Sequence, residues 1–444
     1  MINDTIKLLN LEAFNLNERN IDSIDITKDT GIIKCYILLK KNTKCCPECG
    51  GTSLNIKDYR VKKIIHSFSN GNPCVIFYRA RRFKCKYCKA TFYEHNPFSN
   101  KYDKCSTYTR IMVLEKLKSH TKTFTDVAKD FFISAAEVIK IFDNHVQCNR
   151  LPLSKIICFD EVYTSKKYDN KYAFVMVDPI KRKIIDIRSS RHKDRLTQYF
   201  SSISKEERLK VEYIVIDMWK SYKDLAEIYF KNAIIAVDSF HVIKHLNDAM
   251  TSIRIKIMRK YDKRTKSLLA NDMYYYMLKK FHYFFTKDYD NIYNGPINMP
   301  KMKTKWTKDY IRKYLLSIDE DLSYAYYLKE EYREFSLTAK YDNCDEELDE
   351  LIDKFLNSHL KEFREFGKLI SYWRDNIKNS FIRVDGMRLS NGPIEGINSE
   401  IKTIMKDANG FRNFERFRNR TLYSVNKDIP YKNTYKKDGG ETDL

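Results

Sequence analysis

The chain has 444 residues, of which 43% are hydrophobic, so it is long enough for two to four domains with buried cores. Lys and Arg outnumber Asp and Glu by 81 to 59, and the formal net charge of +22 favours a polyanionic partner, with nucleic acid first. No apolar run approaches the roughly 20 residues of a membrane helix, and no basic flank precedes an apolar run at the N-terminus, so neither a membrane segment nor a secretory signal is expected.

Residues 1–105 are predicted to form an N-terminal region built around a zinc ribbon. The run Ile32–Leu39 is typical of a strand. Two CxxC knuckles, Cys46 with Cys49 and Cys85 with Cys88, present four thiolates to one tetrahedral zinc ion. The long spacer between them must form a hairpin or small sheet, with Val75–Tyr78 as a candidate strand. Cys45 is an alternative to Cys46, and a redox dithiol or plain buried cysteines are alternatives to zinc.

The segment from 41 to 120 holds more than half of the positive surplus, with 17 Lys and Arg against 5 Asp and Glu. Basic residues crowd the second knuckle and alternate with Phe83 and Tyr87, a composition that suits contact with a DNA backbone. A solvated basic face is the alternative. The basic residues are Arg79, Arg81, Arg82, Lys84, Lys86 and Lys89.

Residues 106–150 have the rhythm of a helix-turn-helix. Val127 and Ala128 would face inward on the first helix and Ile133 would fill the turn. Ser134 can cap the second helix, with Glu137 as the other half of a capping box. An ordinary helical hairpin is the alternative interpretation.

Residues 151–243 change character and predict five buried strands separated by polar residues. Helices are expected over 196–204 and 221–230, between the later strands. Residues 244–384 are charged, aromatic and helical in spacing, and we expect an all-helical insertion. Residues 385–427 would return to the same domain, and 428–444 would be a polar tail. The five apolar runs are 156–159, 172–177, 183–187, 213–216 and 233–237.

Two aspartates follow strands at positions where a site can form. Asp160 comes directly after the first run and Asp217 directly after the fourth. Two carboxylates on adjacent strand ends can bind two Mg²⁺ ions for phosphodiester chemistry. An aspartate that only caps a turn is the alternative for each.

A third acid is found near the start of a late helix. An Asn-Gly-Pro turn opens this helix, and Glu395, Asn398, Ser399 and Lys402 are predicted to share one face. Ile394, Ile397, Ile401 and Ile404 would form the buried stripe. Glu395 is equally explained by ordinary stabilisation of the first helical turn.

These elements together resemble the ISL3-type family of bacterial insertion-sequence transposases. The matching strings occur in the expected order. They are Cys46-Pro-Glu-Cys-Gly, Asp160-Glu161, Asp217-Met-Trp-Lys-Ser-Tyr222, Asp238-Ser-Phe-His-Val242, Ser390-Asn-Gly-x-x-Glu-Gly-x-Asn398 and Gly410-Phe-Arg-Asn-Phe414.

The resemblance implies a multidomain α+β chain: zinc ribbon, helix-turn-helix and a ribonuclease-H-like mixed α/β catalytic domain interrupted by the insertion. It implies a DDE triad of Asp160, Asp217 and Glu395 with two Mg²⁺ or Mn²⁺ ions, beside a structural Zn²⁺. Asp238 and His241 match a supporting Asp-x-x-His signature. Asn398, on the late helix, is implied as a further supporting residue. Asp238 competes with Asp217 as second ligand; Asp217 is preferred because the fourth strand lies beside the first in this fold.

The implied activity is cleavage at transposon ends followed by attack of the freed 3′-hydroxyl on target DNA. The expected partners are double-stranded terminal inverted repeats and target DNA, bound by a homo-oligomer in the bacterial cytoplasm, at the nucleoid when on DNA. A DNA-binding regulator, a nuclease that does not join, and an inactive copy are alternatives. Lys402, Arg412, Arg416, Arg418 and Arg420 are expected to hold DNA backbone.

Overall fold

The computed structural model describes the chain except residues 1, 30, 67–72, 165–170, 266–268 and 433–444. The chain divides into two units. Unit 1 comprises Met1–Arg150, Thr164–Tyr168 and Asn398–Leu444, and unit 2 comprises Leu151–Tyr163 and Asp169–Ile397. The units are described separately below. In the described part of the chain, no helix combines the length and apolarity needed to cross a bilayer.

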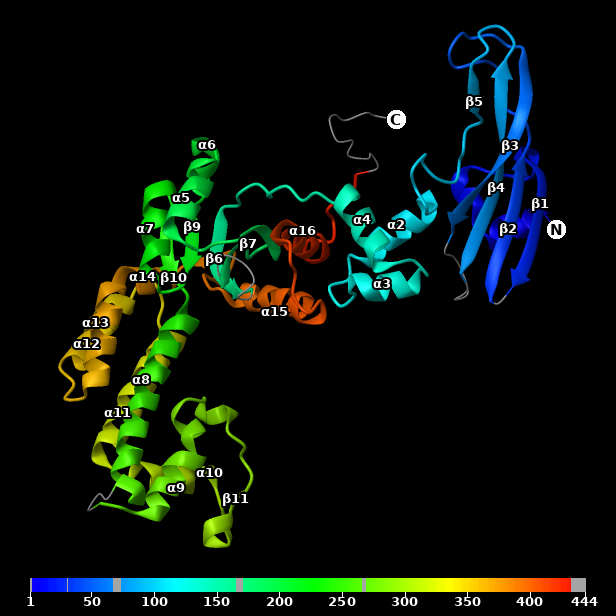
Figure 1. Cartoon of the computed structure of the whole chain (residues 1–444). Coiled ribbons are helices and arrows are strands. Elements are labelled where there is room, and N and C mark those ends of the chain that lie inside the picture. Colours follow the sequence, from blue (N-terminus) through cyan, green and yellow to red (C-terminus); the bar gives the residue numbers. More distant parts are fainter. Residues whose placement is uncertain (1, 30, 67–72, 165–170, 266–268, 433–444) are drawn as a thin grey trace. The chain divides into compact units, whose positions relative to one another are not determined.

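Unit 1 begins with a five-stranded sheet in the order β1-β2-β4-β3, with β5 paired to β4 (Figure 1). The predicted strand at Ile32–Leu39 is confirmed as β2, and the predicted run at 75–78 is part of the longer β4. Small helices cover one face through Leu9, Leu11 and Phe14, which pack with Ile37 and Ile76. The elements are α1 (Ile2–Leu8), η1 (Leu11–Phe14), η2 (Glu18–Asn20), β1 (Ile21–Asp29), β2 (Ile32–Leu39), β3 (Leu54–Ile65), β4 (Cys74–Cys85) and β5 (Thr91–Tyr93).

Three helices follow the sheet: α2 (Thr107–Lys116), α3 (Phe124–Asp130) and α4 (Ala135–His145). The Ser134 hydroxyl accepts a hydrogen bond from the Glu137 backbone amide at 3.1 Å, so the predicted cap of α4 is confirmed. The reciprocal capping box is found one helix earlier, between Thr123 and Asp126 at the start of α3. Val127 and Ala128 are buried as predicted. The chain therefore encodes both helix starts locally.

The C-terminal helix α16 (Phe414–Val425) belongs to unit 1 and packs against the α2–α4 helices. Its Tyr423 ring meets Phe142 of α4 edge-on, with 5.9 Å between ring centroids. His145, the last residue of α4, also bonds through Nδ1 to the Lys432 carbonyl at 2.7 Å. The helical region after the sheet is thus completed by a segment from nearly 300 residues later.

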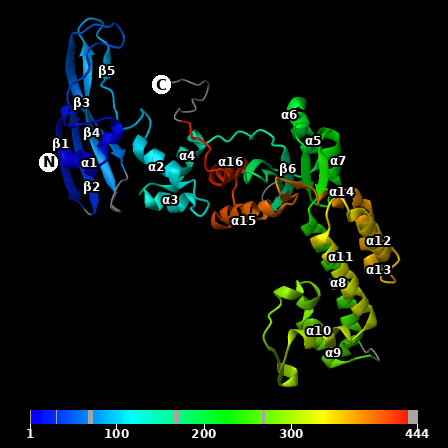
Figure 2. The ribbon, with the colours of Figure 1, turned by 180° about the vertical axis from the view of Figure 1, so that it is seen from behind.

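Unit 2 contains a second five-stranded sheet in the order β10-β9-β6-β7-β8. Figure 2 shows helices α5 and α7 of this unit side by side. All five predicted strands are confirmed, and β9 lies beside β6 in parallel, as the ribonuclease-H-like arrangement requires. Helices α5 and α7 pack together over one face through Phe200, Tyr222 and Phe230. The elements are β6 (Ile156–Tyr163), β7 (Tyr172–Asp178), β8 (Lys183–Arg188), α5 (Lys193–Ser201), α6 (Lys205–Leu209), β9 (Tyr213–Ile216), α7 (Lys220–Tyr229) and β10 (Ile234–Val237).

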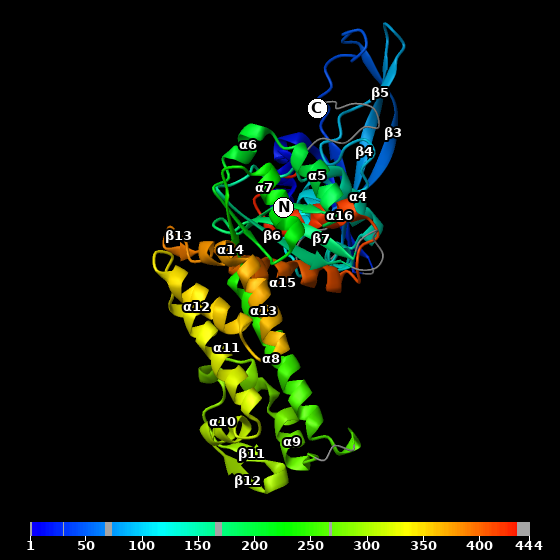
Figure 3. The same ribbon diagram turned by 90° about the vertical axis from the view of Figure 1, so that its left-hand side faces the viewer.

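The predicted insertion continues directly from the sheet. Helix α8 leaves the end of β10 and runs beside α11, and both helices extend away from the sheet (Figures 1 and 3). Leu246, Met250 and Ile253 of α8 share one hydrophobic core with the sheet, so the insertion is not a separately packed domain. Its helices are α8 (Ser239–Lys260), η3 (Lys263–Thr265), α9 (Asp272–Lys280), η4 (His282–Phe285), η5 (Tyr289–Asn291), η6 (Pro300–Met302), α10 (Lys308–Leu316), α11 (Glu320–Thr338), α12 (Cys344–Leu356), α13 (Lys361–Tyr372) and α14 (Arg374–Asn379).

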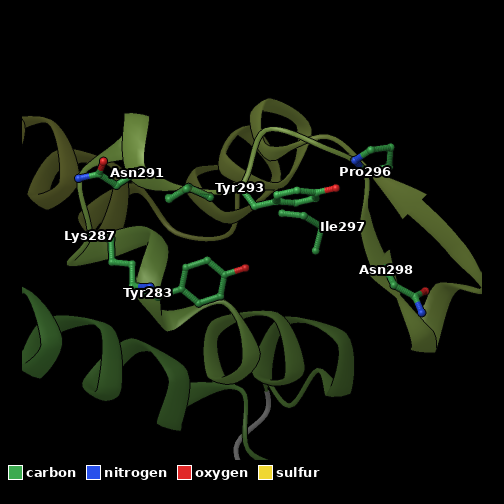
Figure 4. Close-up of a pocket in the computed structure, with 8 residues that line it drawn as sticks. Tyr283, Lys287, Asn291, Tyr293, Pro296, Ile297 and Asn298 are labelled. Carbon is green, nitrogen blue, oxygen red and sulfur yellow. The ribbon is translucent and has the colours of Figure 1, made fainter.

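The insertion is not purely helical, because two short hairpins interrupt it. Strands β11 (Ile297–Met299) and β12 (Thr304–Trp306) pair across η6, where Lys303 takes a left-handed conformation. Strands β13 (Arg383–Val384) and β14 (Met387–Arg388) pair across Asp385-Gly386, both with positive φ, which is the favoured two-residue hairpin turn. A hollow of about 510 Å³ lies beside the first hairpin and is lined by residues between 283 and 298. Figure 4 shows these lining side chains. None of the candidate site residues lines the hollow.

Candidate active site and metal-binding cluster

Three aspartates stand at the same level on three neighbouring parallel strands of unit 2. Cys158 of β6 pairs with Val215 of β9, and Val215 pairs with Ala236 of β10. Asp160, Asp217 and Asp238 each lie two residues further on, so the register aligns them, with neighbouring strands about 4.8 Å apart. Asp160 lies inside β6 rather than after it, because that strand continues to Tyr163.

The aspartates lie on the sheet face opposite α5 and α7. Side chains alternate along a strand, and Phe159 and Ile216 pack into the core beneath those helices. Asp160 and Asp217 therefore share the other face with Cys158 and Val215. The Cys158 sulfur lies 4.0 Å from the Ser390 carbonyl, so the segment that leads into α15 (Gly392–Asp407) covers this face.

Asn391, the residue before α15, connects the strand ends. Its backbone amide donates to Asp238 Oδ1 at 3.1 Å. Its side-chain Nδ2 lies 3.4 Å from Asp217 Oδ1 and 3.4 Å from the Phe159 carbonyl oxygen. The sequence indicated Asn391 as part of the turn that opens the Glu395 helix and of the family string Ser390-Asn-Gly, but predicted no contact with the acidic site. Its position directly before the Glu395 helix was the available signal.

His241 of α8 is the second group that contacts Asp217, with Nε2 2.9 Å from Oδ1. Burial lowers the pKa of His241, but the hydrogen bond and charge of Asp217, with the charges of Asp238 and Asp160, outweigh it and raise the pKa. Burial also raises the pKa of Asp238, although the Asn391 amide and His241 oppose this shift. The site is therefore a buried concentration of negative charge that favours a cation.

Glu395 lies one helical turn beyond Asn391 on α15 and is exposed. In the described residues, the one group of three or more Cys, His, Asp or Glu side chains with ligand atoms all within 4.8 Å is the cysteine cluster. The structure thus brings Asp160 and Asp217 to neighbouring strands, and places Glu395 on the adjoining helix without such close contact.

The four predicted zinc ligands come together in unit 1. The sulfur atoms of Cys46 and Cys88 are 3.6 Å apart, as are those of Cys49 and Cys85, and all four lie within 4.8 Å of one another. Zinc–sulfur bonds of about 2.3 Å in a tetrahedron require sulfur separations close to these. The Cys46 alternative is therefore preferred over Cys45, which is not part of the cluster.

Both CxxC knuckles are followed by a residue with the same left-handed backbone conformation. The residue after each second cysteine is left-handed: Gly50 with φ 70° and Lys89 with φ 63°. This turn directs amides at sulfur, and the Cys88 and Tyr87 amides lower the pKa of Cys85 to about 7. At Cys88 the Ala90 amide also lowers the pKa, but hydrogen bonds from the neighbouring thiols and burial raise it to about 12. A cation between the four sulfurs would favour the thiolate form of all four cysteines.

The comparison with protein families decides the identity of the chain at family level. The model of the ISL3-type DDE family, described as "Transposase", matches residues 157–421. This span is more than half of the chain, and it includes the three aligned aspartates and α15. The chain belongs to this transposase family.

Individual relatives of this transposase-family chain are distant. It is similar to the transposase for insertion sequence element IS1001 of Bordetella parapertussis, with 20% identity over 242 residues. The alignment covers 53% of this chain and 58% of that protein, so the chain spans little more than half of its curated relative. Among solved structures it is similar to the Drosophila P element transposase strand transfer complex, with 13% identity and a TM-score of 0.39. That match covers 73% of this chain and 93% of the other, but such a TM-score is too low to assign a fold.

Two of the arginines predicted to bind DNA are structural in this transposase-family chain. Arg81 is buried, pairs with Glu94 at 3.2 Å and donates to the Leu39 carbonyl at 2.5 Å. Because β4 is an interior strand, the Arg81 guanidinium joins neighbouring segments of the chain. Arg82 is half-buried and lies 3.5 Å from Asp58, whereas Arg79 and Lys84 remain exposed.

Three arginines of α16 that were predicted to hold DNA backbone make contacts within unit 1. Arg416 pairs with Asp143 of α4 at 2.6 Å, and Arg418 donates to the Cys148 carbonyl at 2.7 Å. Arg420 is buried and donates to the Ser119 and Lys122 carbonyls, each at 2.8 Å. These side chains fasten α16 to the preceding helices. Lys402 and Arg412 are exposed, as a DNA contact requires.

Asn398 departs from the predicted exposed face of α15. It is 9% exposed, whereas Glu395, Ser399 and Lys402 are exposed. Asn398 follows Ile394 by four residues, so it lies at the border of the isoleucine stripe. The stripe itself is buried as predicted.

A further ionic group lies beside the site and was not predicted. Glu161 pairs with Arg191, which follows β8. The Arg191 guanidinium lies 4.4 Å from the Tyr172 ring and 4.8 Å from the Trp219 ring. Because Glu161 follows Asp160 and Trp219 closely follows Asp217, this cluster braces both strand ends.

Proposed function

We propose that the chain is a DNA transposase that binds insertion-sequence ends and catalyses metal-dependent DNA cleavage and strand transfer. One observation carries the proposal: in a chain of a transposase family, the register brings Asp160 of β6 level with Asp217, which directly follows the neighbouring β9, beside the helix that bears Glu395. Carboxylates drawn from two strands and a helix suit divalent cations bound during phosphodiester chemistry.

The site residues fit Mg²⁺ or Mn²⁺, because the proposed ligands Asp160, Asp217 and Glu395 are all oxygen donors. Two such ions would activate the attacking oxygen and stabilise the leaving oxygen of the phosphodiester. His241 and Asn391 both contact the Oδ1 oxygen of Asp217. Asp238 fixes the start of α15 through the Asn391 amide, which favours Asp217 over Asp238 as the second ligand.

DNA binding is proposed for unit 1. Helices α3 and α4 form the helix-turn-helix, and exposed Arg79, Lys84, Lys402 and Arg412 supply positive charge for phosphates. A structural Zn²⁺ bound by the four cysteines would hold the ends of β3 and β4 together. The proposed partners are terminal inverted repeats and target DNA, bound by a homo-oligomer in the bacterial cytoplasm and, on DNA, at the nucleoid.

The test incubates the zinc-loaded full chain with a labelled duplex of its own element's end and Mn²⁺ or Mg²⁺. We expect cleavage and joined products that are lost in Asp160→Ala, Asp217→Ala and Glu395→Ala. Asp224→Ala is the matched control, since Asp224 pairs with Lys193 at 2.6 Å on the surface. Cleavage that survives Asp217→Ala would contradict the proposal. Cleavage without joining would make the chain a nuclease.

A further inference from the structure

Asn391 stands where a helix-capping residue belongs, but its side chain is turned to the acidic site. A capping asparagine normally accepts an amide from the second or third helical residue. Here the second residue is Pro393, which has no N–H, and the Ile394 amide donates to the Asn391 backbone carbonyl at 2.8 Å. The side-chain amide instead lies 3.4 Å from Asp217 Oδ1 and from the Phe159 carbonyl. The Asn391 side chain therefore does not cap α15 and contacts the acidic site instead.

The side-chain oxygen of Asn391 has no hydrogen-bond partner within the described residues, although the residue is only 3% exposed. An unpaired buried amide oxygen is energetically unfavourable, because it loses its hydrogen bonds to water without replacement. Asp217 lies beside the side-chain nitrogen and Asp238 accepts the backbone amide, and both offer only acceptors when ionised, so neither satisfies the oxygen. A cation satisfies an amide oxygen and carboxylates together.

We propose that Asn391 Oδ1 is an oxygen ligand of the divalent cation that Asp217 binds. This inference rests on the proposed function and adds a neutral ligand to its three acids. Both contacts of Nδ2 are at the long end for hydrogen bonds, so little holds the amide in its present orientation. Rotation by 180° about the terminal side-chain bond exchanges the oxygen and nitrogen, and places Oδ1 beside Asp217 Oδ1.

Asp238 acts as a positioning residue in this arrangement. It accepts the Asn391 backbone amide at 3.1 Å, a bond that survives any side-chain substitution at 391. It therefore holds the asparagine, and α15 with Glu395, against the strand ends. Carbonyl oxygens of asparagine are ordinary ligands of hard cations, so the donor set remains one for Mg²⁺ or Mn²⁺.

The experiment measures Mn²⁺ binding to the zinc-loaded full chain by calorimetry or by electron paramagnetic resonance of free Mn²⁺, without DNA. Asn391→Leu should weaken Mn²⁺ binding by about 10- to 100-fold. Asn391→Asp keeps an oxygen donor but loses the N–H donor, and should bind Mn²⁺ at least as tightly as the unmodified chain. Asn376→Leu is the matched control, because Asn376 is buried and donates to the Ile235 carbonyl at 3.0 Å. Thermal melting checks the fold of each variant.

The outcomes separate this inference from the proposed function. If Asp217→Ala binds Mn²⁺ like the unmodified chain, the proposed metal site itself is wrong. If Asp217→Ala loses binding but Asn391→Leu does not, only the role of Asn391 is overturned. If Asn391→Asp loses binding, the side chain acts through its N–H groups and the ligand assignment fails. This last comparison decides the matter even if the leucine variant does not fold.

Discussion

The cysteine cluster of unit 1 and the acidic site of unit 2 differ in how completely the chain assembles them. Each CxxC motif is four residues long and is followed by a residue with positive φ. At Cys85 and Cys88, backbone amides also point to the sulfurs. The four sulfurs already lie within 4.8 Å of one another. The acids come from β6, the end of β9 and α15, and depend on strand register and helix placement. The cysteine site consists of two local motifs, and folding alone brings its four sulfurs together. The acidic site consists of distant segments, and we expect bound ligands to bring its carboxylates fully together.

The largest expected effect concerns the local site. Cys49→Ser removes one of four zinc ligands, and apparent binding free energies of structural zinc are about 10–16 kcal/mol. We expect loss of bound zinc and protease sensitivity at the ends of β3 and β4, measured by metal analysis and limited proteolysis. Cys45→Ser is the control and should retain zinc, since Cys45 lies outside the cluster. Equal zinc loss in both variants would show that the ligand set is wrong.

The next effect tests whether α16 is a structural element. Arg420→Met leaves the Ser119 and Lys122 carbonyls without their donor, and each lost partner costs about 1–3 kcal/mol. We expect a lower free energy of unfolding by denaturant. Exposed Arg412→Met should change stability by less than about 0.5 kcal/mol and instead weaken DNA binding. If Arg420→Met stays stable but loses DNA affinity, the sequence-based assignment of α16 to DNA was right.

A smaller effect depends on pH. Burial lowers the pKa of His66, whose ring bonds to the Ser106 hydroxyl at 2.8 Å and to the Leu9 carbonyl at 2.7 Å. Below the ordinary pKa of 6.5 the unfolded chain binds a proton that the folded chain does not, so stability falls as pH falls. The slope contributed by His66 is at most about 1.4 kcal/mol per pH unit. Denaturation of His66→Gln between pH 7 and 5 should show a shallower slope, and an unchanged slope would refute this account.

The smallest expected effect is the coupling between Arg416 and Asp143, which joins α16 to α4. Both side chains are about one-third exposed, so solvent screening limits the pair to about 0.2–1 kcal/mol. A double-mutant cycle with Arg416→Met and Asp143→Asn measures this coupling from unfolding free energies. If the coupling is zero at low salt, the pair contributes nothing, and the buried contacts of Arg418 and Arg420 hold α16 in place.

The sequence predicted most of the secondary structure because that information is local. Five apolar runs became the five strands of unit 2, Ser134 capped its helix, and the isoleucine stripe of α15 was buried. The basic residues were harder, because charge in a sequence does not reveal exposure. Arg81 and Arg420 look like DNA contacts in the sequence, yet tertiary packing turns both toward backbone carbonyls.

What the sequence determined by itself was the chemistry available: four thiols in two knuckles, aspartates after apolar runs, and an acid at the start of a late helix. Tertiary structure alone decided which of these meet. The parallel register aligned Asp238 with Asp160 and Asp217, and the approach of α15 brought Asn391 to them. The physical reason is that register and helix packing are set by buried surfaces far along the chain, whereas a knuckle is set by the few residues within it.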